Sequence, residues 1–409
     1  MPIAAWTTLT RPLRHRNFRL FASGQMISLI GTWVQNVSEA WLVYRLTGSS
    51  AALGLVRFAG LAPIFVLALV GGDWADRADR RRILIGTQTA AMVLAFILAV
   101  LCFTEQVRVW IIILLAAMLG VVNAIDNPTR QSFVVEMVGK EDLAGAIGFN
   151  SSMFHTARII GPTVAGALLA TVGEAWCFTV NGLSFLAVIA CLALIRIPDA
   201  PRPAPQGEFL TRIKAGISFA WTSPPIRSLL SLVAVTSLFG SSFLVLMPVV
   251  AKEVLGRGAD GYSLLMTAAG VGSLTGALIL TLRRNAGLWA LRSLASLAFG
   301  LTLILFSLSG TFWLSMLLAV PAGLFMILLM ATSNTLLQTL APDEMRGRVM
   351  ALFAMMFMGM SPFGSLGAGL VAEFIGVGHA LSLCGAVCLA AGLFLGRSSA
   401  GSAKPDHER

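Results

Sequence analysis

The chain has 409 residues, of which 57% are hydrophobic and 12% are charged. A soluble globular domain carries about 25% charged residues, so this composition excludes a protein made only of water-soluble domains. The formal net charge of +10 would suit a nucleic-acid-binding protein. However, the basic residues lie mostly in loops, where membrane orientation and anionic lipid headgroups explain them better. No nucleic-acid partner is therefore expected, and membrane lipids are.

Twelve apolar segments of membrane-spanning length follow one another along the chain. A bilayer core requires about 20 apolar residues per spanning helix. Unbroken apolar runs favour helices over membrane strands, whose residues would alternate. We therefore expect an all-α integral membrane protein with twelve transmembrane helices. The expected spans are 18–46, 51–71, 83–103, 109–127, 143–170, 176–195, 227–250, 262–282, 289–308, 312–336, 347–374 and 378–396.

The strongest local signal is the run from Gly72 to Arg82, which carries seven charges between two apolar segments. Such a run cannot lie in hydrocarbon, so it predicts a tight loop at a membrane face. Four of the charges are arginines, and by the positive-inside rule this face is cytoplasmic. With the amino terminus on the same side, 23 of the 29 Lys and Arg residues are cytoplasmic, 4 are external, and Arg57 and Arg158 lie within spans. Both termini are therefore expected in the cytoplasm.

The longest polar stretch, 196–226, divides the spans six and six. Its first part is rich in proline and is expected to be an extended linker. Its second part, Phe209 to Trp221, mixes apolar and basic residues and predicts a short amphipathic helix in the cytoplasmic interface. We expect an N-terminal six-helix bundle over 1–195, the linker over 196–226, and a C-terminal bundle over 227–409 that ends in a short cytoplasmic tail.

The two halves resemble each other in sequence. Three glycines of the first half recur 202 or 203 residues later: Gly145, Gly166 and Gly173 match Gly347, Gly369 and Gly376. Two parallel six-span repeats with a central site between them are a recurrent plan of secondary transporters. The repeat predicts two pseudo-symmetric six-helix bundles.

The stretch Gly72-x-x-Ala75-Asp76-Arg77-x-x-Arg80-Arg81-x-x-Leu84 resembles the signature that major facilitator superfamily (MFS) transporters carry between spans two and three. It departs at Asp79, where the signature usually has glycine. This resemblance covers nearly the full length of the chain and implies the MFS fold.

A narrower resemblance is to the bacterial branch that contains the enterobactin exporter and related drug efflux proteins. It rests on four matching pieces: Gly31-Thr32-Trp33-Val34-Gln35, the stretch from Trp41 to Ser49, the stretch from Asn127 to Phe133, and Ala157-Arg158-x-x-Gly161-Pro162. The resemblance implies export of small organic molecules across the bacterial inner membrane.

Span five also resembles the glycine-proline element of drug/proton antiporters, which bends a helix. The matching residues are Gly161, Pro162 and Gly166, with one glycine where the usual form has a pair. The arginine that antiporters carry well inside span four is missing, because Arg130 lies at the inner end of that span.

Several charged residues could form a cytoplasmic gate. Asp76, at the inner end of span two, can complement the amino terminus of a helix in the other half. The loop arginines can pair with acids at the inner end of span four, for which Asp126 is the nearest candidate and Glu136 the second. Such pairs would hold the cytoplasmic side shut and break on opening. The alternative is a solvated positive-inside anchor, which we assign to Asp79 and Arg82. The expected gate residues are Gly72, Asp76, Arg77, Arg80, Arg81, Asp126 and Arg130.

Charges embedded in the spans are candidates for coupling. Arg158 lies about 15 residues into span five, where a charge costs about 2.5–3.5 kcal/mol on insertion scales. We favour a substrate or proton-coupling role for it over a structural ion pair. Glu39 and Arg57 either pair as an outer structural clamp, or Glu39 titrates as the proton carrier. His155 could relay protons, although a hydrogen-bonded helix contact is the favoured interpretation for a lone histidine.

Polar residues on span one predict either a stripe toward a cavity or hydrogen bonds between helices. They are Gln25, Ser28, Gln35, Asn36 and Ser38.

The favoured hypothesis is a secondary transporter that exports small organic molecules, siderophore-like or drug-like, by alternating access as a proton antiporter. The alternatives are a proton-coupled uptake symporter of the same fold, a membrane enzyme and a non-transporting receptor. The sequence contains no nucleophile elbow, metal-ligand cluster or phosphate-binding loop. We therefore expect no enzymatic activity, no metal and no cofactor, with the proton gradient as the energy source and a monomer as the working state.

Overall fold

The computed structural model describes residues 10–77, 79–139, 141–196, 217–283 and 287–397, without the side chains of 68–77, 282, 343, 396 and 397. Every regular element in these ranges is helical, so the predicted all-α class is confirmed. The expected interfacial helix at 209–221 falls mostly outside the described residues, and only 217–222 are seen to be helical. The expected linker boundary at 196–226 therefore stays a prediction.

The described chain contains twelve helical rods of membrane-spanning length. The first six are α2 (Arg16–Thr47), α3 (Ser50–Arg77), α4 (Arg80–Phe103), α5 (Val109–Val138), α6 (Leu143–Thr171) and α7 (Glu174–Leu194). The seventh rod runs from Pro224 to Val254 as α9 (Pro224–Val235), the π-helix η2 (Thr236–Gly240), α10 (Ser242–Val245), α11 (Met247–Val249) and the π-helix η3 (Val250–Val254). The last five are α12 (Ala259–Leu282), α13 (Leu288–Leu308), α14 (Phe312–Leu340), α15 (Asp343–Ile375) and α16 (Val377–Arg397). A short 3-10 helix, η1 (Arg11–Arg14), precedes them.

Ten of these rods are long and apolar enough to cross a membrane by length and composition. The two that are not among the ten, within the described residues, are α2 and α6, although they have 32 and 29 residues. Both carry polar side chains near their middle, such as Gln35 on α2 and Asn150 on α6. Polar residues in a membrane helix must face protein or a water-filled cavity. The low hydropathy of α2 and α6 thus indicates helices that face a polar interior.

Packing divides the chain into two compact units. Unit 1 contains Met1–Gly48 and Ala59–Gln206, and unit 2 contains Ser49–Phe58 and Gly207–Arg409, as far as these ranges are described. The first turns of α3 therefore belong to unit 2 and the rest of the helix to unit 1, and the bundle boundaries expected from the sequence stay predictions.

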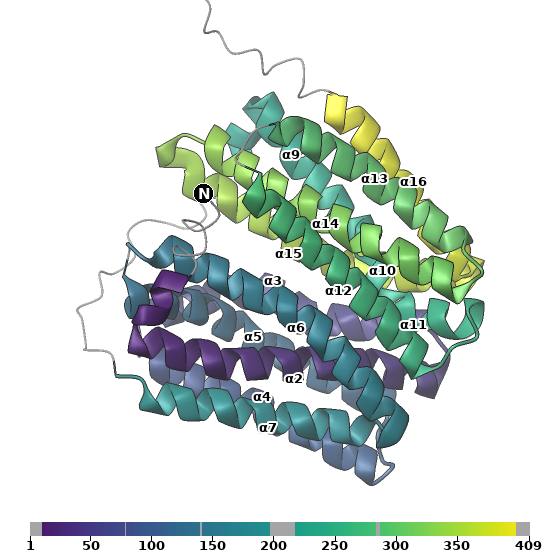
Figure 1. Cartoon of the computed structure of the whole chain (residues 1–409), viewed down its shortest axis with the longest axis horizontal. Coiled ribbons are helices and arrows are strands. Elements are labelled where there is room, and N and C mark those ends of the chain that lie inside the picture. The colour runs from purple at the N-terminus through teal and green to yellow at the C-terminus, as the bar shows by residue number, and fades with distance from the viewer. Residues whose placement is uncertain (1–9, 78, 140, 197–216, 284–286, 398–409) are drawn as a thin grey trace, which may run out of the picture. The chain divides into compact units, whose positions relative to one another are not determined.

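Unit 1 is built around α2, which packs on α6 and α7, while α4 packs on α5 and α7 (Figure 1). Glycine permits the closest approach, because a Cβ atom at Gly31 of α2 would lie 2.7 Å from Asn181 Oδ1 of α7. One end of the unit is filled by a buried apolar cluster drawn from several helices, including Phe18, Phe21, Leu84, Phe133, Met153 and Leu192. This cluster fixes the helices that carry the polar residues described below.

Unit 2 packs α12 on α14, and α13 on α14 and α16. Within this unit, Glu373 of α15 holds the start of α3. Its Oε2 accepts hydrogen bonds from Ser49 Oγ at 3.0 Å, Ser50 Oγ at 3.0 Å and the backbone N–H of Ala51 at 3.1 Å. A carboxylate at the start of a helix satisfies free N–H groups and complements the helix dipole.

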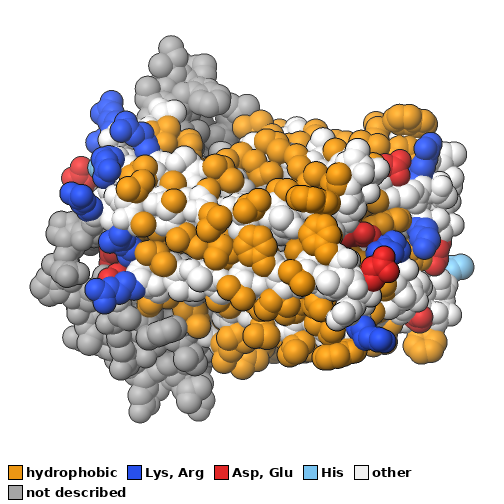
Figure 2. All heavy atoms as spheres, turned by 90° about the horizontal axis from the view of Figure 1, so that it is seen from below, with side chains coloured by type: hydrophobic (Ala, Val, Ile, Leu, Met, Phe, Trp, Pro, Cys, Tyr) orange, Lys and Arg blue, Asp and Glu red, His pale blue; other side chains and the backbone are white. Residues whose placement is uncertain are grey.

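The surface is apolar where a lipid bilayer would contact it. Figure 2 shows hydrophobic side chains over the middle of the face in view, with Lys, Arg, Asp and Glu gathered toward its two ends. Large side chains such as Phe374 (85% exposed) and Leu308 (72% exposed) project outward. Soluble monomers rarely expose contiguous apolar surface on this scale. The outward side chains therefore fit a chain whose helices are solvated by lipid.

Candidate functional site

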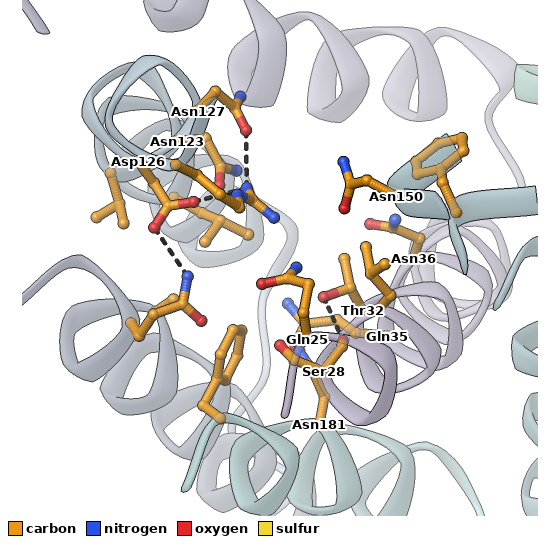
Figure 3. Close-up of a pocket in the computed structure, with 18 of the residues that line it drawn as sticks. Gln25, Ser28, Thr32, Gln35, Asn36, Asn123, Asp126, Asn127, Asn150 and Asn181 are labelled. Atoms are coloured by element: carbon orange, nitrogen blue, oxygen red, sulfur yellow. Dashed lines mark hydrogen bonds and ion pairs between the residues drawn. The ribbon is translucent and has the colours of Figure 1, made fainter. Parts of the chain in front are cut away.

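A cavity of about 350 Å³ lies inside unit 1, among α2, α4, α5, α6 and α7 (Figure 3). Its lining is dominated by one chemical group, the primary carboxamide. Nine such side chains line it: Gln25, Gln35, Asn36, Gln88, Asn123, Asn127, Gln131, Asn150 and Asn181. Phe154 and Phe185 contribute an apolar part of the wall, together with aliphatic side chains.

The cavity contains one buried ion pair. Asp126, which is 1% exposed, lies with Oδ2 at 2.6 Å from Nη2 of Arg130, one turn further along α5. Its Oδ1 accepts hydrogen bonds from Thr87 Oγ1 and Gln88 Nε2 of α4, both at 2.8 Å. A buried carboxylate is tolerated only when it is paired and hydrogen-bonded. Asp126 meets both conditions, and it joins α4 to α5.

A second polar contact joins α2 to α7. Asn181 Nδ2 donates to Gln35 Oε1 at 2.6 Å, and the Ser184 hydroxyl donates to the Asn181 backbone carbonyl at 2.7 Å. Gln35 and Asn181 are therefore partly committed to holding the helices together. For Gln35, this contact matches the interpretation that polar residues of span one form hydrogen bonds between helices.

Other carboxamides on the wall have no such partner. Within the described residues, Gln25, Asn36, Asn123 and Asn150 make no hydrogen bond to the protein, although Gln25 is only 3% exposed. The Oε1 atom of Gln88 is also buried and accepts no hydrogen bond from the described chain. Figure 3 shows Gln25, Asn36 and Asn150 reaching toward the cavity. A buried amide group without a partner costs about 1–3 kcal/mol, so Gln25 and the Gln88 oxygen favour a bound water or ligand, and the partly exposed Asn36, Asn123 and Asn150 are open to one.

The expected gate residues are only partly brought together. Arg80 Nη1 of α4 lies 2.6 Å from Glu136 Oε1 of α5, whereas Asp126 is held by Arg130. Glu136, the second candidate, is thus the partner of Arg80, and Asp126, the first candidate, is not. The reason is that Arg130 follows Asp126 by four residues on the same helix face and pairs with it. The side chains of Asp76 and Arg77 are not described, and Gly72 lies in the same stretch. The gate roles expected for these three residues stay predictions.

Two other loop charges, Arg81 and Asp79, cap helices. Arg81 donates from Nε to the Leu192 carbonyl at 2.7 Å and from Nη2 to the Ala193 carbonyl at 2.5 Å. These are among the last carbonyls of α7, which lack partners within the helix and favour a positive charge. Asp79 caps the start of α4 by accepting from the backbone N–H groups of Arg81 and Arg82. The side chains of Asp79 and Arg82 are 44% and 88% exposed and form a 3.2 Å ion pair.

Arg158 lies in the seam between α6 and α2. It is 5% exposed and does not line the cavity, and its guanidinium is 5.6 Å from the centroid of the Trp33 ring. A Cβ atom at Gly161 would collide with the Cβ of Trp33, so the two helices touch there. Pro162 and Gly166 follow within α6, which continues through them as one helix to Thr171. Arg158 thus lies at a helix contact and outside the cavity lining, and its expected coupling role stays a prediction.

Three other candidates stay untested. His155 is half-buried on α6 beside Phe154, with a ring-centroid distance of 5.8 Å. Glu39 is half-buried in unit 1, whereas Arg57 is an exposed residue of the α3 turns in unit 2. Because the units are described separately, the expected pairing of Glu39 with Arg57 remains a prediction.

Sequence reasoning found the polar stripe of α2 but missed the wall that faces it. Asn123, Asn127 and Gln131 follow one another at intervals of four in α5. Residues four apart lie on one face of a helix, so this spacing of three carboxamides was the available signal. Gln88 of α4 is a single polar residue, and no periodic pattern marks it.

The chain resembles known proteins over most of its length. The model of the transmembrane secretion effector family matches residues 7–405. The chain is 27% identical over 377 residues to the staphyloferrin A transporter of Staphylococcus aureus, covering 90% of this chain and 92% of that protein. It is 26% identical to the multidrug efflux pump Tap of Mycolicibacterium fortuitum, covering 86% and 88%. It is 24% identical to macrolide efflux protein A of Streptococcus pyogenes, covering 90% and 93%.

Solved structures agree on the fold. A bacterial homologue of the human lysosomal transporter Spinster, inward-facing and unoccupied, matches with a TM-score of 0.74 at 14% identity, covering 94% of this chain and 96% of that one. The nucleoside transporter NupG matches with a TM-score of 0.71 at 15% identity, covering 93% and 98%. At these identities the likeness shows the fold alone. The resemblance to MFS transporters is confirmed: this protein belongs to the transmembrane secretion effector family of the major facilitator superfamily, a family of transporters and not of enzymes.

Proposed function

We propose that this protein is a secondary transporter of the bacterial inner membrane that exports a small organic molecule by alternating access. The relatives named above support this, because they are a siderophore transporter and two kinds of drug efflux protein. Alternating access follows from the superfamily's plan, in which two repeats move against each other around a central site.

The observation that carries the proposal is the carboxamide-lined cavity. Secondary transporters bind substrate near the middle of the membrane on residues of their own helices. The cavity supports this proposal, because it lies among five helices of unit 1 and presents amides that lack protein partners among the described residues. Its volume is at the lower end of the roughly 300–1,000 Å³ typical of ligand pockets.

We place the arginine-rich end of unit 1, where α4 begins, at the cytoplasmic face, with both termini on that side. Arg80 and Glu136 would then form part of a cytoplasmic gate, together with Gly72, Asp76, Arg77 and Arg81. The 2.6 Å contact between Arg80 and Glu136 supports this assignment, since an ion pair between two helices can break when the helices move.

Proton antiport is the proposed energy coupling. Asp126 and Arg130 are the charged pair in the cavity, and protonation of Asp126 would remove the charge that holds Arg130. Glu39 is the second candidate for the titrating group. The substrate and the proton would compete if the substrate bound Arg130 only while the ionised Asp126 holds the guanidinium in place.

The test is accumulation in inside-out membrane vesicles with an imposed pH gradient. An antiporter that exports from the cell should accumulate its substrate in vesicles with an acidic interior, saturably, and should stop when nigericin collapses the gradient. Vesicles without the protein are the control. An uptake symporter would instead require right-side-out vesicles with an acidic exterior. If neither vesicle type accumulates any member of a panel of siderophores, macrolides and other small organic molecules, the proposal is wrong.

A further inference from the structure

We infer that the cavity of unit 1 binds an uncharged, oxygen-rich molecule with several hydroxyl, amide or carbonyl groups, and that it selects against lipophilic cations. This inference rests on the proposed function and narrows its substrate class. Two observations on the cavity lining support it. The charged side chains of the lining neutralise each other, and several of its carboxamides have no hydrogen-bond partner among the described residues.

The charge balance excludes an ionic anchor for a cationic ligand. Asp126 and Arg130 are the charged side chains among the described residues that line the cavity, and they neutralise each other at 2.6 Å. Thr87 and Gln88 complete the hydrogen bonding of Asp126. A cation entering the cavity would find Asp126, the one carboxylate of the described lining, already paired, and it would lose its own hydration without compensation.

The hydrogen-bonding capacity of the wall requires a ligand that both donates and accepts. A primary carboxamide offers two N–H donors and an acceptor oxygen. Gln25, Asn36, Asn123 and Asn150 bring this capacity to the cavity from three different helices, with no protein partner among the described residues. The buried Oε1 of Gln88 adds an acceptor. Hydroxyl and amide groups can match such a set, whereas a hydrocarbon or a quaternary cation leaves it unpaired.

The guanidinium of Arg130 adds directional donors. Its contacts to Asp126 and Asn127 both use Nη2, the second at 2.9 Å. Arginine has five N–H donors in a fixed fork, so Nη1 and Nε can serve oxygen atoms of a ligand. Phe154 and Phe185 supply an apolar surface on which the carbon skeleton of the ligand can lie.

A site built to hydrogen-bond its substrate discriminates strongly against analogues that lack those groups, because its buried polar groups are then left unpaired. Removing the Gln25 amide should therefore weaken a polar ligand about tenfold, which corresponds to about 1.4 kcal/mol. The same change should leave an apolar cation unaffected or bound more tightly.

The experiment is calorimetric titration of the full chain in lipid nanodiscs. The probes are a neutral disaccharide, a neutral N-acetylated dipeptide amide, citrate and tetraphenylphosphonium. We expect at least one neutral probe to bind, tetraphenylphosphonium not to bind, and Gln25→Leu to weaken the neutral probe about tenfold. Asn150→Ala is the second cavity variant, should Gln25→Leu fail to fold. Gln338→Leu is the matched control, since it removes an exposed carboxamide of α14 outside the cavity.

The outcomes separate the inference from the proposed function. Binding of tetraphenylphosphonium, of citrate alone or of no neutral probe overturns the inference. An equal effect of Gln25→Leu and Gln338→Leu overturns it as well. If a lipophilic cation is accumulated in vesicles with a pH gradient, the transporter stands and the inference fails. If neutral probes bind in the cavity but no vesicle accumulates any of them, the inference stands and the proposed function fails.

Discussion

Replacing Asp126 by asparagine should destabilise unit 1 severely. The change removes the charge that holds Arg130 at 2.6 Å and turns an amide N–H₂ toward the guanidinium, while the remaining oxygen still faces Thr87 and Gln88. Removing one member of a buried ion pair costs about 3–5 kcal/mol. The Arg130 side chain is 22% exposed, so solvent recovers part of the loss, and we expect about 3 kcal/mol. For a unit of this size, with about 2–4 °C per kcal/mol, the melting temperature should fall by roughly 6–12 °C.

The assay is thermal unfolding of purified protein in one detergent, read by aggregation and by tryptophan fluorescence. The double variant Asp126→Asn with Arg130→Leu should recover more than half of the lost stability, because no charge is left uncompensated and the asparagine oxygen can still accept from Thr87 and Gln88. Glu141→Gln, at an exposed position before α6, is the control for losing one acid. If Asp126→Asn melts like the control, or if the double variant is as unstable as the sum of the single variants, the assigned ion pair does not stabilise the unit.

Three further predictions concern helix contacts. Gly161→Ala should lower the melting temperature because the new Cβ atom would collide with Trp33. The control Gly86→Ala on α4, where no heavy atom lies within 4 Å of the new Cβ, should raise the melting temperature slightly because alanine favours the helix. Equal melting temperatures of the two variants would contradict this. Glu373→Gln should destabilise the start of α3 by about 1 kcal/mol, which hydrogen exchange at the backbone amide of Ala51 would report as a faster rate. An unchanged exchange rate would show that Glu373 does not cap α3. Arg81→Gln should fray the end of α7 and expose it to protease, while an unchanged cleavage pattern would count against the capping role.

The sequence predicts the helices well because their main requirement is apolar length. Expected spans 18–46 and 83–103 agree closely with α2 (Arg16–Thr47) and α4 (Arg80–Phe103). Span four was expected to end at residue 127, before Pro128, but α5 continues to Val138. Hydropathy detects only the part of a helix that meets lipid, and a membrane helix tolerates proline where neighbouring groups satisfy the freed carbonyl. The π-helical turns of the seventh rod carry no signal in hydropathy.

The site was predictable only in part, because a sequence shows what each helix carries but not which helices meet. The stripe on α2 was recognised, and Gln35 and Asn36 do line the cavity. Arg158 was favoured as a coupling charge because an embedded arginine is costly, and the structure adds only that its guanidinium lies 5.6 Å from the centroid of the Trp33 ring and outside the cavity lining. Its role stays a prediction. The pairing of Asp126 with Arg130 could have been predicted, because residues four apart in a helix are neighbours, whereas the loop arginines lie on another helix. The carboxamides of α4, α6 and α7 join the site only through the tertiary fold.

The most direct test of the account asks whether a transported compound occupies the cavity of unit 1. In a variant whose five native cysteines are replaced, Asn150→Cys should react with a small maleimide, and the compound identified by vesicle transport should slow that reaction. A cysteine at Gln338, outside the cavity, should react at the same rate with and without the compound. Protection at 150 alone is the predicted result. Equal labelling at 150 with and without a compound that the protein demonstrably transports would contradict the central claim.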